Sequence, residues 1–403
     1  MTAIRGDLTE AGATTAIAVS ESAMTYRHFL NWLCAATASL LLVTPALANP
    51  TMLFDLESGR VITHQEAFKR WYPASLSKLM TAYVVFRAID AGEVALDSPI
   101  RMTKKAAAEP PSKFGLKPGT VMRLDTALKI MLVKSANDVA MAIAENVGGS
   151  QKGFAERMNA EAARLGMTGS HFVNPHGLFS PEQYTTARDM ALLARALRRD
   201  YPQYSPWFSI EGLAFGKKTI PNYNLLIGRY EGADGMKTGF VCASGFNLIG
   251  SATRNGRTLV AVVLGEQTAI SRAEATARLL DAGFAVSPGA TGATTISSLQ
   301  PYGDTTTPND VRDIVCRKKS PQEQSEGPPV AASDKPKSPF QEKLANPTLV
   351  AVKLGGATGP VPKAMRDAAG KAYADVPIPD WRPDLPPPAG FALSAQGDQA
   401  SAN

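Results

Sequence analysis

Apolar residues near the start of the folded part change from a strand-like to a helical pattern. Residues 52–56 are mostly apolar and extended in character, residues 57–59 have turn composition, and residues 60–63 begin a second β-rich run. This order predicts a β-hairpin. Over residues 76–89 the apolar positions recur three and four apart. That spacing predicts a helix with a deeply buried apolar face.

Further periodic segments continue as far as residue 284. The spacing of apolar residues predicts helices over residues 124–144, 154–165, 184–197 and 271–284. Two β-rich runs, 246–252 and 258–264, flank Arg254–Asn255–Gly256. An Asn-Gly pair between two such runs is a strong hairpin signal. We therefore expect one folded domain of mixed helices and strands over residues 49–285.

The composition changes abruptly after residue 285. Residues 286–403 are rich in Gly, Thr, Pro, Ser and Gln, and no apolar period persists, so we expect a largely disordered, low-complexity tail. Within it, residues 347–354 could form an isolated strand, and residues 376–388 resemble an extended Pro-rich ligand. Residues 390–403 are polar and have no basic, amphipathic face. We therefore expect no C-terminal amphipathic anchor, while membrane association remains open.

The N-terminal segment has the pattern of a secretory signal peptide. Arg27 and His28 precede an apolar stretch over residues 29–43, and small residues 46–48 follow it. We expect residues 1–48 to be removed after Ala48, which makes the mature protein exported and periplasmic; an uncleaved anchor is the alternative. Residues 1–23 are an unusual leader, and Met24 is the expected true start.

The overall composition narrows the class of protein. Of 403 residues, 44% are hydrophobic and 19% are charged, which is enough for one large core or two modest ones. Lys and Arg outnumber Asp and Glu by 42 to 36, but no basic run interleaves with aromatic residues, so no nucleic-acid partner is expected. The spacing of the three cysteines suits neither a zinc ribbon nor a disulfide-dense scaffold. At most one disulfide can form within the chain.

The first segment with candidate chemistry is Pro73–Ala74–Ser75–Leu76–Ser77–Lys78. Pro73 marks a helix start, and Ser75 and Lys78 lie three apart, on one helical face. A serine hydroxyl needs a neighbouring base to act as a nucleophile, and a desolvated lysine can serve as one. A Ser-x-x-Lys match by itself is weak, because exposed helices contain it by chance.

Two further segments could complete a site. Ser135 and Asn137 lie in or just after an apolar helix, where a hydroxyl could relay protons and a carboxamide could hold a substrate amide. Lys237–Thr238–Gly239 precedes a strand-like run. On an edge strand it offers a cation and a hydroxyl for a terminal carboxylate, and Gly239 leaves the backbone open to a peptide. Taken alone, Ser135 and Asn137 are more often a helix-ending cap, and Lys237–Thr238–Gly239 is typical of a turn before a strand.

The three segments in this order resemble the D-alanyl-D-alanine carboxypeptidases among the low-molecular-mass penicillin-binding proteins, over about residues 50–285. The connecting segments 174–178, 186–190 and 235–239 are also similar to that family. The resemblance implies an α+β fold of the penicillin-recognising serine D,D-peptidase/β-lactamase-like kind. Such a fold has a mainly antiparallel sheet covered by helices and an all-helical lobe.

The resemblance also implies roles for individual residues. Ser75 would be the nucleophile, Lys78 its general base and Ser135 a proton relay, while Asn137 would bind the substrate amide and contact Lys78. Lys237, Thr238 and Gly239 would bind the substrate, with the first two on the D-Ala carboxylate. The backbone N–H groups of Ser75 and Phe240 would form the oxyanion hole. His176 and Asp200 lie where family members have a pair that tunes deacylation; a capping or core-polar role is the alternative.

The implied reaction needs no metal or cofactor. Peptidoglycan stem peptides would be the substrate, and β-lactam antibiotics would acylate Ser75 as inhibitors. A D,D-endopeptidase and a non-catalytic murein-binding protein are the alternatives. A class A β-lactamase is disfavoured, because no Glu-x-x-Leu-Asn lies between Ser135 and Lys237.

The cysteines offer one further expectation. Cys242 follows the Lys237 segment, and Cys316 lies in the early tail. In an oxidising compartment a bridge between them would attach the tail to the catalytic sheet. Two separate buried thiols are the alternative.

Overall fold

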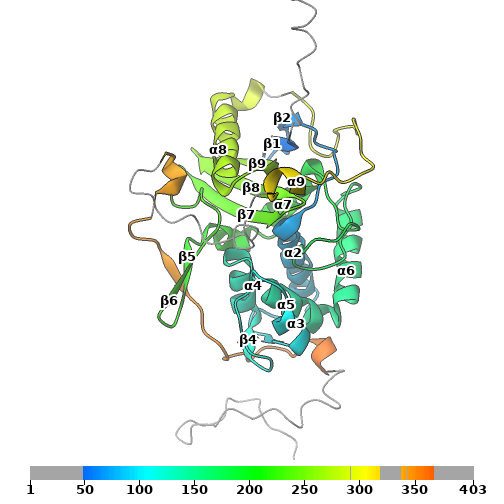
Figure 1. Ribbon diagram of the computed structural model, residues 1–403, viewed down its shortest axis with the longest axis vertical. Helices are drawn as coiled ribbons and strands as arrows, with labels where there is room; N and C mark the ends of the chain where they lie inside the picture. The colour runs from blue at the N-terminus through cyan, green and yellow to red at the C-terminus, as the bar shows by residue number, and fades with distance from the viewer. Residues whose placement is uncertain (1–48, 291, 318–336, 343, 367–403) are drawn as a thin grey trace, which may run out of the picture. The chain divides into compact units, whose positions relative to one another are not determined.

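The computed structural model describes residues 49–290, 292–317, 337–342 and 344–366 (Figure 1). The predicted signal peptide over residues 1–48 lies outside the described residues, as does the Pro-rich segment 376–388. Within the described part of the chain, no helix combines the length and apolar character needed to cross a membrane.

A five-stranded antiparallel sheet with the order β2-β1-β9-β8-β7 organises the domain. Its strands are β1 (Thr51–Asp55), β2 (Val61–Gln65), β7 (Ala233–Val241), β8 (Gly245–Arg254) and β9 (Arg257–Glu266). Both predicted hairpins are present. Asn255 and Gly256 join β8 to β9 with φ of +50° and +76°, the left-handed backbone that an Asn-Gly turn provides.

Helices pack on both faces of the sheet. The α-helices are α2 (Ser77–Asp90), α3 (Lys104–Ala108), α4 (Leu124–Val133), α5 (Asn137–Gly148), α6 (Gln151–Arg164), α7 (Ala187–Asp200), α8 (Ala269–Ala285) and α9 (Arg312–Val315). The 3-10 turns are η1 (Ala74–Leu76), η2 (Pro202–Ser209), η3 (Pro288–Ala290) and η4 (Pro339–Gln341). Two small sheets complete the set: β3 (Pro99–Arg101) with β4 (Val121–Arg123), and β5 (Gly212–Phe215) with β6 (Lys218–Pro221) and β10 (Leu349–Ala351).

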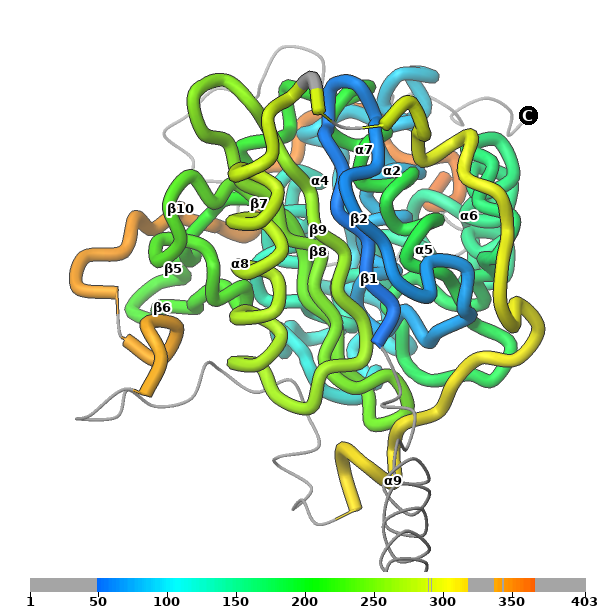
Figure 2. Tube along the Cα trace, turned by 90° about the horizontal axis from the view of Figure 1, so that it is seen from above, coloured from blue at the N-terminus to red at the C-terminus, as the bar shows by residue number. Residues whose placement is uncertain are grey.

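Alternating side chains of the sheet build two apolar layers. Helix α8 covers one face of the sheet (Figure 2). Leu53 and Ala261 belong to the apolar cluster on that face, together with Leu280 of α8. Met52 and Val262 point the other way, into the larger core shared with α2 and α7. Neighbouring residues of a strand face opposite sides of the sheet, so each apolar strand contributes side chains to both apolar layers. This larger core continues into a helical lobe of α3 to α6, and the η1 turn directly before α2 lies beside β7.

The helix predicted over residues 124–144 is two helices. The break falls between α4 and α5, where Ser135 has φ +61°. A left-handed residue cannot continue an α-helix. The apolar period runs on through both helices, so it does not reveal the break.

The low-complexity segment after residue 285 is partly packed on the domain. Thr294 accepts a backbone hydrogen bond from Val61 (2.9 Å), and the side chain of Ile296 is buried. The predicted strand at 347–354 is present as β10, but it is not isolated, because it pairs in parallel with β5. The packed chain therefore extends well past residue 285, held largely through backbone groups that leave no apolar pattern in the sequence.

Candidate active site

Ser75 lies in the single turn η1, directly before α2, and the sheet holds this turn in place. The Asn247 side chain on β8 donates to the carbonyl oxygens of Tyr72 (3.0 Å) and Pro73 (3.3 Å). Its Oδ1 accepts from the N–H of Gly265 on β9 (3.0 Å). One buried carboxamide thus joins two strands to the segment that carries the serine.

Lys78 is fully buried, and its Nζ lies within hydrogen-bond distance of three oxygens. These are Ser75 Oγ (2.9 Å), Asn137 Oδ1 (2.8 Å) and the carbonyl of His176 (2.6 Å). Three residues of separation on a helix brings Lys78 to Ser75, as the spacing predicts. Asn137 of α5 contacts the same amine, as the resemblance implies. A buried amine at hydrogen-bond distance from a hydroxyl is the arrangement that proton abstraction from a serine requires.

A second lysine meets the second serine. The Nζ of Lys237 donates to Ser135 Oγ (2.9 Å) and to the carbonyl of Thr238 (2.9 Å). Lys237 and Ser135 are both buried. The five residues named from the Ser-x-x-Lys, Ser-x-Asn and Lys-Thr-Gly patterns therefore lie together where α2, α5 and β7 meet.

Strand β7 is the edge of the five-stranded sheet, and Gly239 brings its backbone against the nucleophile. A Cβ at Gly239 would lie 3.0 Å from both the Pro73 carbonyl oxygen and the Ser75 nitrogen. Only glycine allows that approach. The next residue, Phe240, is buried against Phe246 of β8, with ring centroids 4.1 Å apart. Its side chain therefore packs in the core, which leaves its backbone as the part available to a ligand.

Arg272 of α8 is a buried cation beneath this edge, which the sequence analysis missed. Its guanidinium lies over the ring of Phe246 (5.4 Å to the centroid), and Nη1 points at the carbonyls of Gly239 (3.4 Å) and Asn247 (3.3 Å). A single arginine in an amphipathic helix carries no local signal. Only the packing of α8 on the sheet reveals it.

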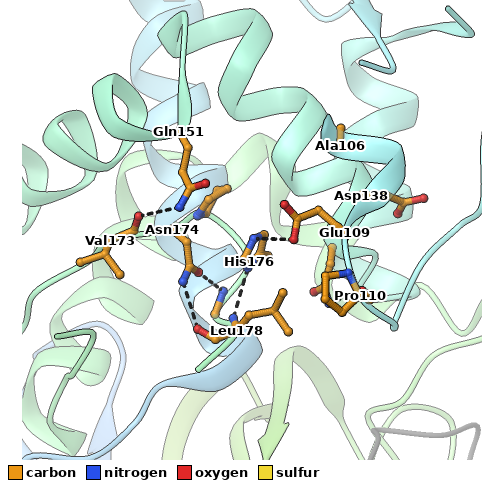
Figure 3. A network of polar contacts seen from close by, with 12 residues as sticks. Ala106, Glu109, Pro110, Asp138, Gln151, Val173, Asn174, His176 and Leu178 are labelled. Carbon is orange, nitrogen blue, oxygen red and sulfur yellow. Dashed lines mark hydrogen bonds and ion pairs between the residues drawn. The ribbon is translucent and has the colours of Figure 1, made fainter. Parts of the chain in front are cut away.

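His176 pairs with Glu109, and each nitrogen of its imidazole ring has a polar partner (Figure 3). Its Nε2 lies 3.2 Å from Glu109 Oε2, and its Nδ1 accepts from the Leu178 N–H (3.2 Å). Burial lowers the pKa of His176 below its usual value, although Glu109 acts in the opposite direction. The imidazole is therefore neutral at pH 7, with its hydrogen on Nε2. Glu109 was not singled out from the sequence, because it lies before two prolines, outside the recognised segments.

The structure gives His176 and Asp200 different partners. Asp200 lies at the exposed C-terminal end of α7, where Tyr83 Oη donates to its carboxylate (2.9 Å). Burial and this carboxylate together raise the pKa of Tyr83 to about 12. His176 instead lies beside Lys78, and its carboxylate partner is Glu109. The two residues are similar to the family's pair in sequence position, but packing gives each another partner.

Cys242 and Cys316 form a disulfide, so the alternative of two separate thiols does not hold. Cys242 is the first residue after β7, and next to it the Ala243 carbonyl accepts from the Val311 N–H (3.0 Å). Arg312 lies over the ring of Phe179 (4.8 Å to the centroid). Residues 309–316, which we call the strap, therefore adjoin the end of the strand that carries Lys237.

Comparisons with known proteins agree with this geometry. A family model described as D-alanyl-D-alanine carboxypeptidase matches residues 43–268. D-alanyl-D-alanine carboxypeptidase DacC of Escherichia coli (strain K12) is 36% identical over 279 residues, which cover 64% of this chain and 70% of the relative. DacA of Haemophilus influenzae is 35% identical over 250 residues, covering 60% of this chain and 64% of the relative.

Solved structures are similar over the same region. Penicillin binding protein 5 of Haemophilus influenzae has a TM-score of 0.57 and 35% identity, covering 60% of this chain and 73% of that one. Penicillin-binding protein D2 of Listeria monocytogenes, in a cefotaxime-bound form, has a TM-score of 0.54 and 31% identity, covering 59% of this chain and 97% of that one. The similar region contains the serine, both lysines and the sheet, and leaves the strap outside the family match.

Proposed function

Because the chain belongs to the D-alanyl-D-alanine carboxypeptidase family of serine peptidases, we propose that it removes the terminal D-alanine from peptidoglycan stem peptides through an acyl-enzyme on Ser75. The observation that carries this proposal is the buried Lys78 amine, 2.9 Å from Ser75 Oγ. A neutral amine at this position can accept the Ser75 proton, which is what a general base requires.

Acylation begins when Lys78 takes the proton of Ser75 and Oγ attacks the carbonyl of the penultimate D-Ala. The oxyanion that forms is stabilised by the backbone N–H groups of Ser75 and Phe240. When the C–N bond breaks, the departing D-Ala amine receives a proton by way of Ser135, which the Lys237 ammonium holds. Water then hydrolyses the ester, and Ser75 regains its proton.

The edge of β7 orients the substrate in this proposal. A peptide that adds to an edge strand gains main-chain hydrogen bonds, and Gly239 keeps the strand open and close to Ser75. Lys237 and Thr238 supply a cation and a hydroxyl for the terminal carboxylate. Asn137 supplies a carboxamide for the substrate amide. Because this site suits a substrate that ends in a free carboxylate, it favours release of a terminal D-alanine over cleavage of a cross-link.

The nucleophile is tested by intact-protein mass spectrometry after brief exposure to penicillin. The wild type should gain one drug-sized adduct, and Ser75→Ala should gain none, because the attacking hydroxyl is missing. An adduct on Ser75→Ala would place the nucleophile elsewhere. If the wild type neither forms an adduct nor hydrolyses the drug, a murein-binding role without catalysis is the better interpretation.

The leaving group is tested with two substrates. A stem pentapeptide should release free D-alanine faster than a cross-linked dimer is cut. The terminal D-alanine of the pentapeptide ends in a free carboxylate that Lys237 and Thr238 can bind, whereas the carboxyl group of the cross-linked D-Ala is tied up in the amide bond. Faster cleavage of the dimer would favour the D,D-endopeptidase alternative.

The location of the protein is part of the same proposal. Its substrate lies outside the cytoplasm, and we infer export through residues 1–48 into the periplasm. N-terminal sequencing of the mature protein should begin at Asn49. A mature protein that begins upstream of residue 29 would favour an uncleaved anchor.

A further inference from the structure

Four contacts form a closed ring around the amine of Lys78. Lys78 donates to the His176 carbonyl (2.6 Å), and the His176 ring contacts Glu109 (3.2 Å). The next residue, Pro110, accepts from Asn137 Nδ2 at its carbonyl (3.0 Å). Asn137 Oδ1 then accepts from Lys78 (2.8 Å), which completes the ring. Two loops and two helices thus meet at one buried amine.

Two contacts of this ring, Glu109–His176 and Lys78–Asn137, join side chain to side chain, and the other two use a backbone carbonyl. Nδ1 of the imidazole accepts from Leu178, so its hydrogen lies on Nε2 and points at Glu109 (Figure 3). The Glu109 side chain is only 12% exposed and that of His176 only 4%. On the other side, Asn174 accepts from the Gly177 N–H (2.7 Å) and donates to the Leu178 carbonyl (3.0 Å). These hydrogen bonds hold the loop that carries His176, and the Glu109 carboxylate joins the facing loop to it.

We propose that Glu109 is a positioning residue for the Ser75–Lys78 pair, which acts by locking His176 and closing the ring around the Lys78 amine. This inference rests on the proposed function. The direction in which Lys78 offers its lone pair depends on where its other acceptors, the His176 carbonyl and Asn137, are held. A displacement of about 1 Å at such a base lowers the rate of a chemical step by about a hundredfold.

The charge of Glu109 has a separate effect from its hydrogen bond. The charged groups that act on His176 include Glu109, Lys78 of α2 and Lys105 of α3. Lys237 of β7, whose Nζ donates to Ser135 Oγ (2.9 Å), and Asp138 of α5, the residue after Asn137, also lie near this site. A carboxylate near Lys78 favours the ammonium. Its removal therefore favours the neutral amine at lower pH, which moves the acid limb of the acylation rate to lower pH.

Two substitutions separate these effects. Glu109→Ala removes both the acceptor and the charge, and we expect at least a tenfold loss in the rate of acylation by penicillin. Glu109→Gln keeps an oxygen that can accept from Nε2, so its rate at neutral pH should stay within about threefold of wild type, with the acid limb at lower pH. The same ring predicts that Glu109→Ala adds little when His176 is already replaced by Ala.

Glu93 provides a matched control, because its carboxylate also forms an ion pair, with Arg157 (2.9 Å), but lies half exposed on the surface. Glu93→Ala should acylate at the wild-type rate. The proposal is overturned if Glu109→Ala acylates like wild type across the pH range, or if Glu109→Gln loses as much rate as Glu109→Ala with no movement of the acid limb. If the wild type itself forms no penicillin adduct, the proposed function has failed. If the wild type forms it and Glu109→Ala does so equally fast, only the role of Glu109 has failed.

Discussion

Two glycines allow separate segments to reach the nucleophile. Gly239 lets β7 approach the Ser75 nitrogen, as described above. Gly177 has φ +87°, and a Cβ there would lie 1.8 Å from the Ala74 carbonyl oxygen. Ala74 itself has φ +48°, which a non-glycine residue seldom adopts. The turn that presents Ser75 is therefore held from both sides by backbone contacts with no space for a side chain.

Gly177→Ala should damage this turn. The new methyl group must displace Ala74, so we expect penicillin acylation to fall at least about tenfold. Gly216→Ala is the control, since Gly216 also has positive φ (+57°) but nothing within 4 Å of an added Cβ. Both variants lose roughly 1–2 kcal/mol from the left-handed backbone. Equal acylation rates in the two variants would show that the contact with Ala74 does not matter.

Motif spacing makes some site residues predictable and leaves others hidden. Ser75, Lys78 and Lys237 could be named because they belong to short patterns whose joint order is specific. Glu109, Asn247 and Arg272 could not be named, because each lies outside these short patterns. Their contribution depends on the completed fold, and no local pattern records it.

Strand β7 is attached to α7 and β8 by one carboxylate. Asp234 accepts from Arg198 Nη2 (2.9 Å), Ser251 Oγ (2.5 Å) and Thr253 Oγ1 (2.6 Å). Burial alone would raise the pKa of Asp234, but the hydrogen bonds and the charge of Arg198 outweigh it and hold the pKa below its ordinary value of 3.8. A carboxyl group with a lowered pKa in the folded state stabilises the fold above its unfolded pKa.

Asp234→Asn should therefore lower the free energy of unfolding at pH 7, by roughly 1–3 kcal/mol for a partly exposed charged hydrogen-bond network. This stabilisation is lost as the pH falls below about 4 and the wild-type carboxylate takes up a proton. Chemical denaturation of both proteins between pH 3 and 7 measures it. A difference that stays constant over this range would assign the effect to packing, not to charge.

The elements that local chemistry determines could be predicted, and those that distant contacts determine could not. The turn at Asn255–Gly256 was predictable because only a few residues favour its backbone. The break at Ser135 was not, because a serine with positive φ is stabilised by the site around it, where Lys237 contacts its hydroxyl. The break nevertheless positions both Ser135 and Asn137.

The strap and the segments beyond it attach the end of the chain to several parts of the domain. The disulfide joins Cys316 to the end of β7, β10 pairs with β5, and the Gly355 N–H donates to the Val121 carbonyl on β4 (2.9 Å). Low-complexity composition predicted a tail here. The prediction was incomplete because extended segments can be held by backbone hydrogen bonds and one covalent bond, without an apolar period.

Cys316→Ser should release the strap and destabilise the protein. The bridge closes a loop with a sequence separation of 74, and its loss should lower the free energy of unfolding by about 2–4 kcal/mol through the gain in unfolded-state entropy. Thermal denaturation of oxidised protein measures the change. Cys242→Ser and the double variant should lose the same amount, because all three lack the same bond. A double variant much less stable than either single one would contradict this.

The strand order has a consequence for how the chain reaches its native state. The first strand, β1, lies between β2 and β9, and Thr51 pairs with Val263, more than two hundred residues later. A chain that leaves a ribosome or passes through a membrane pore in N-to-C order cannot complete this sheet until β9 has emerged. Pairings so distant in sequence slow folding and expose strand edges in the interim. The five-stranded sheet, including the β7 edge beside Ser75, can therefore close only after residue 266 of the 403 has emerged, so the nucleophile gains its surroundings late in synthesis and not with the first helix.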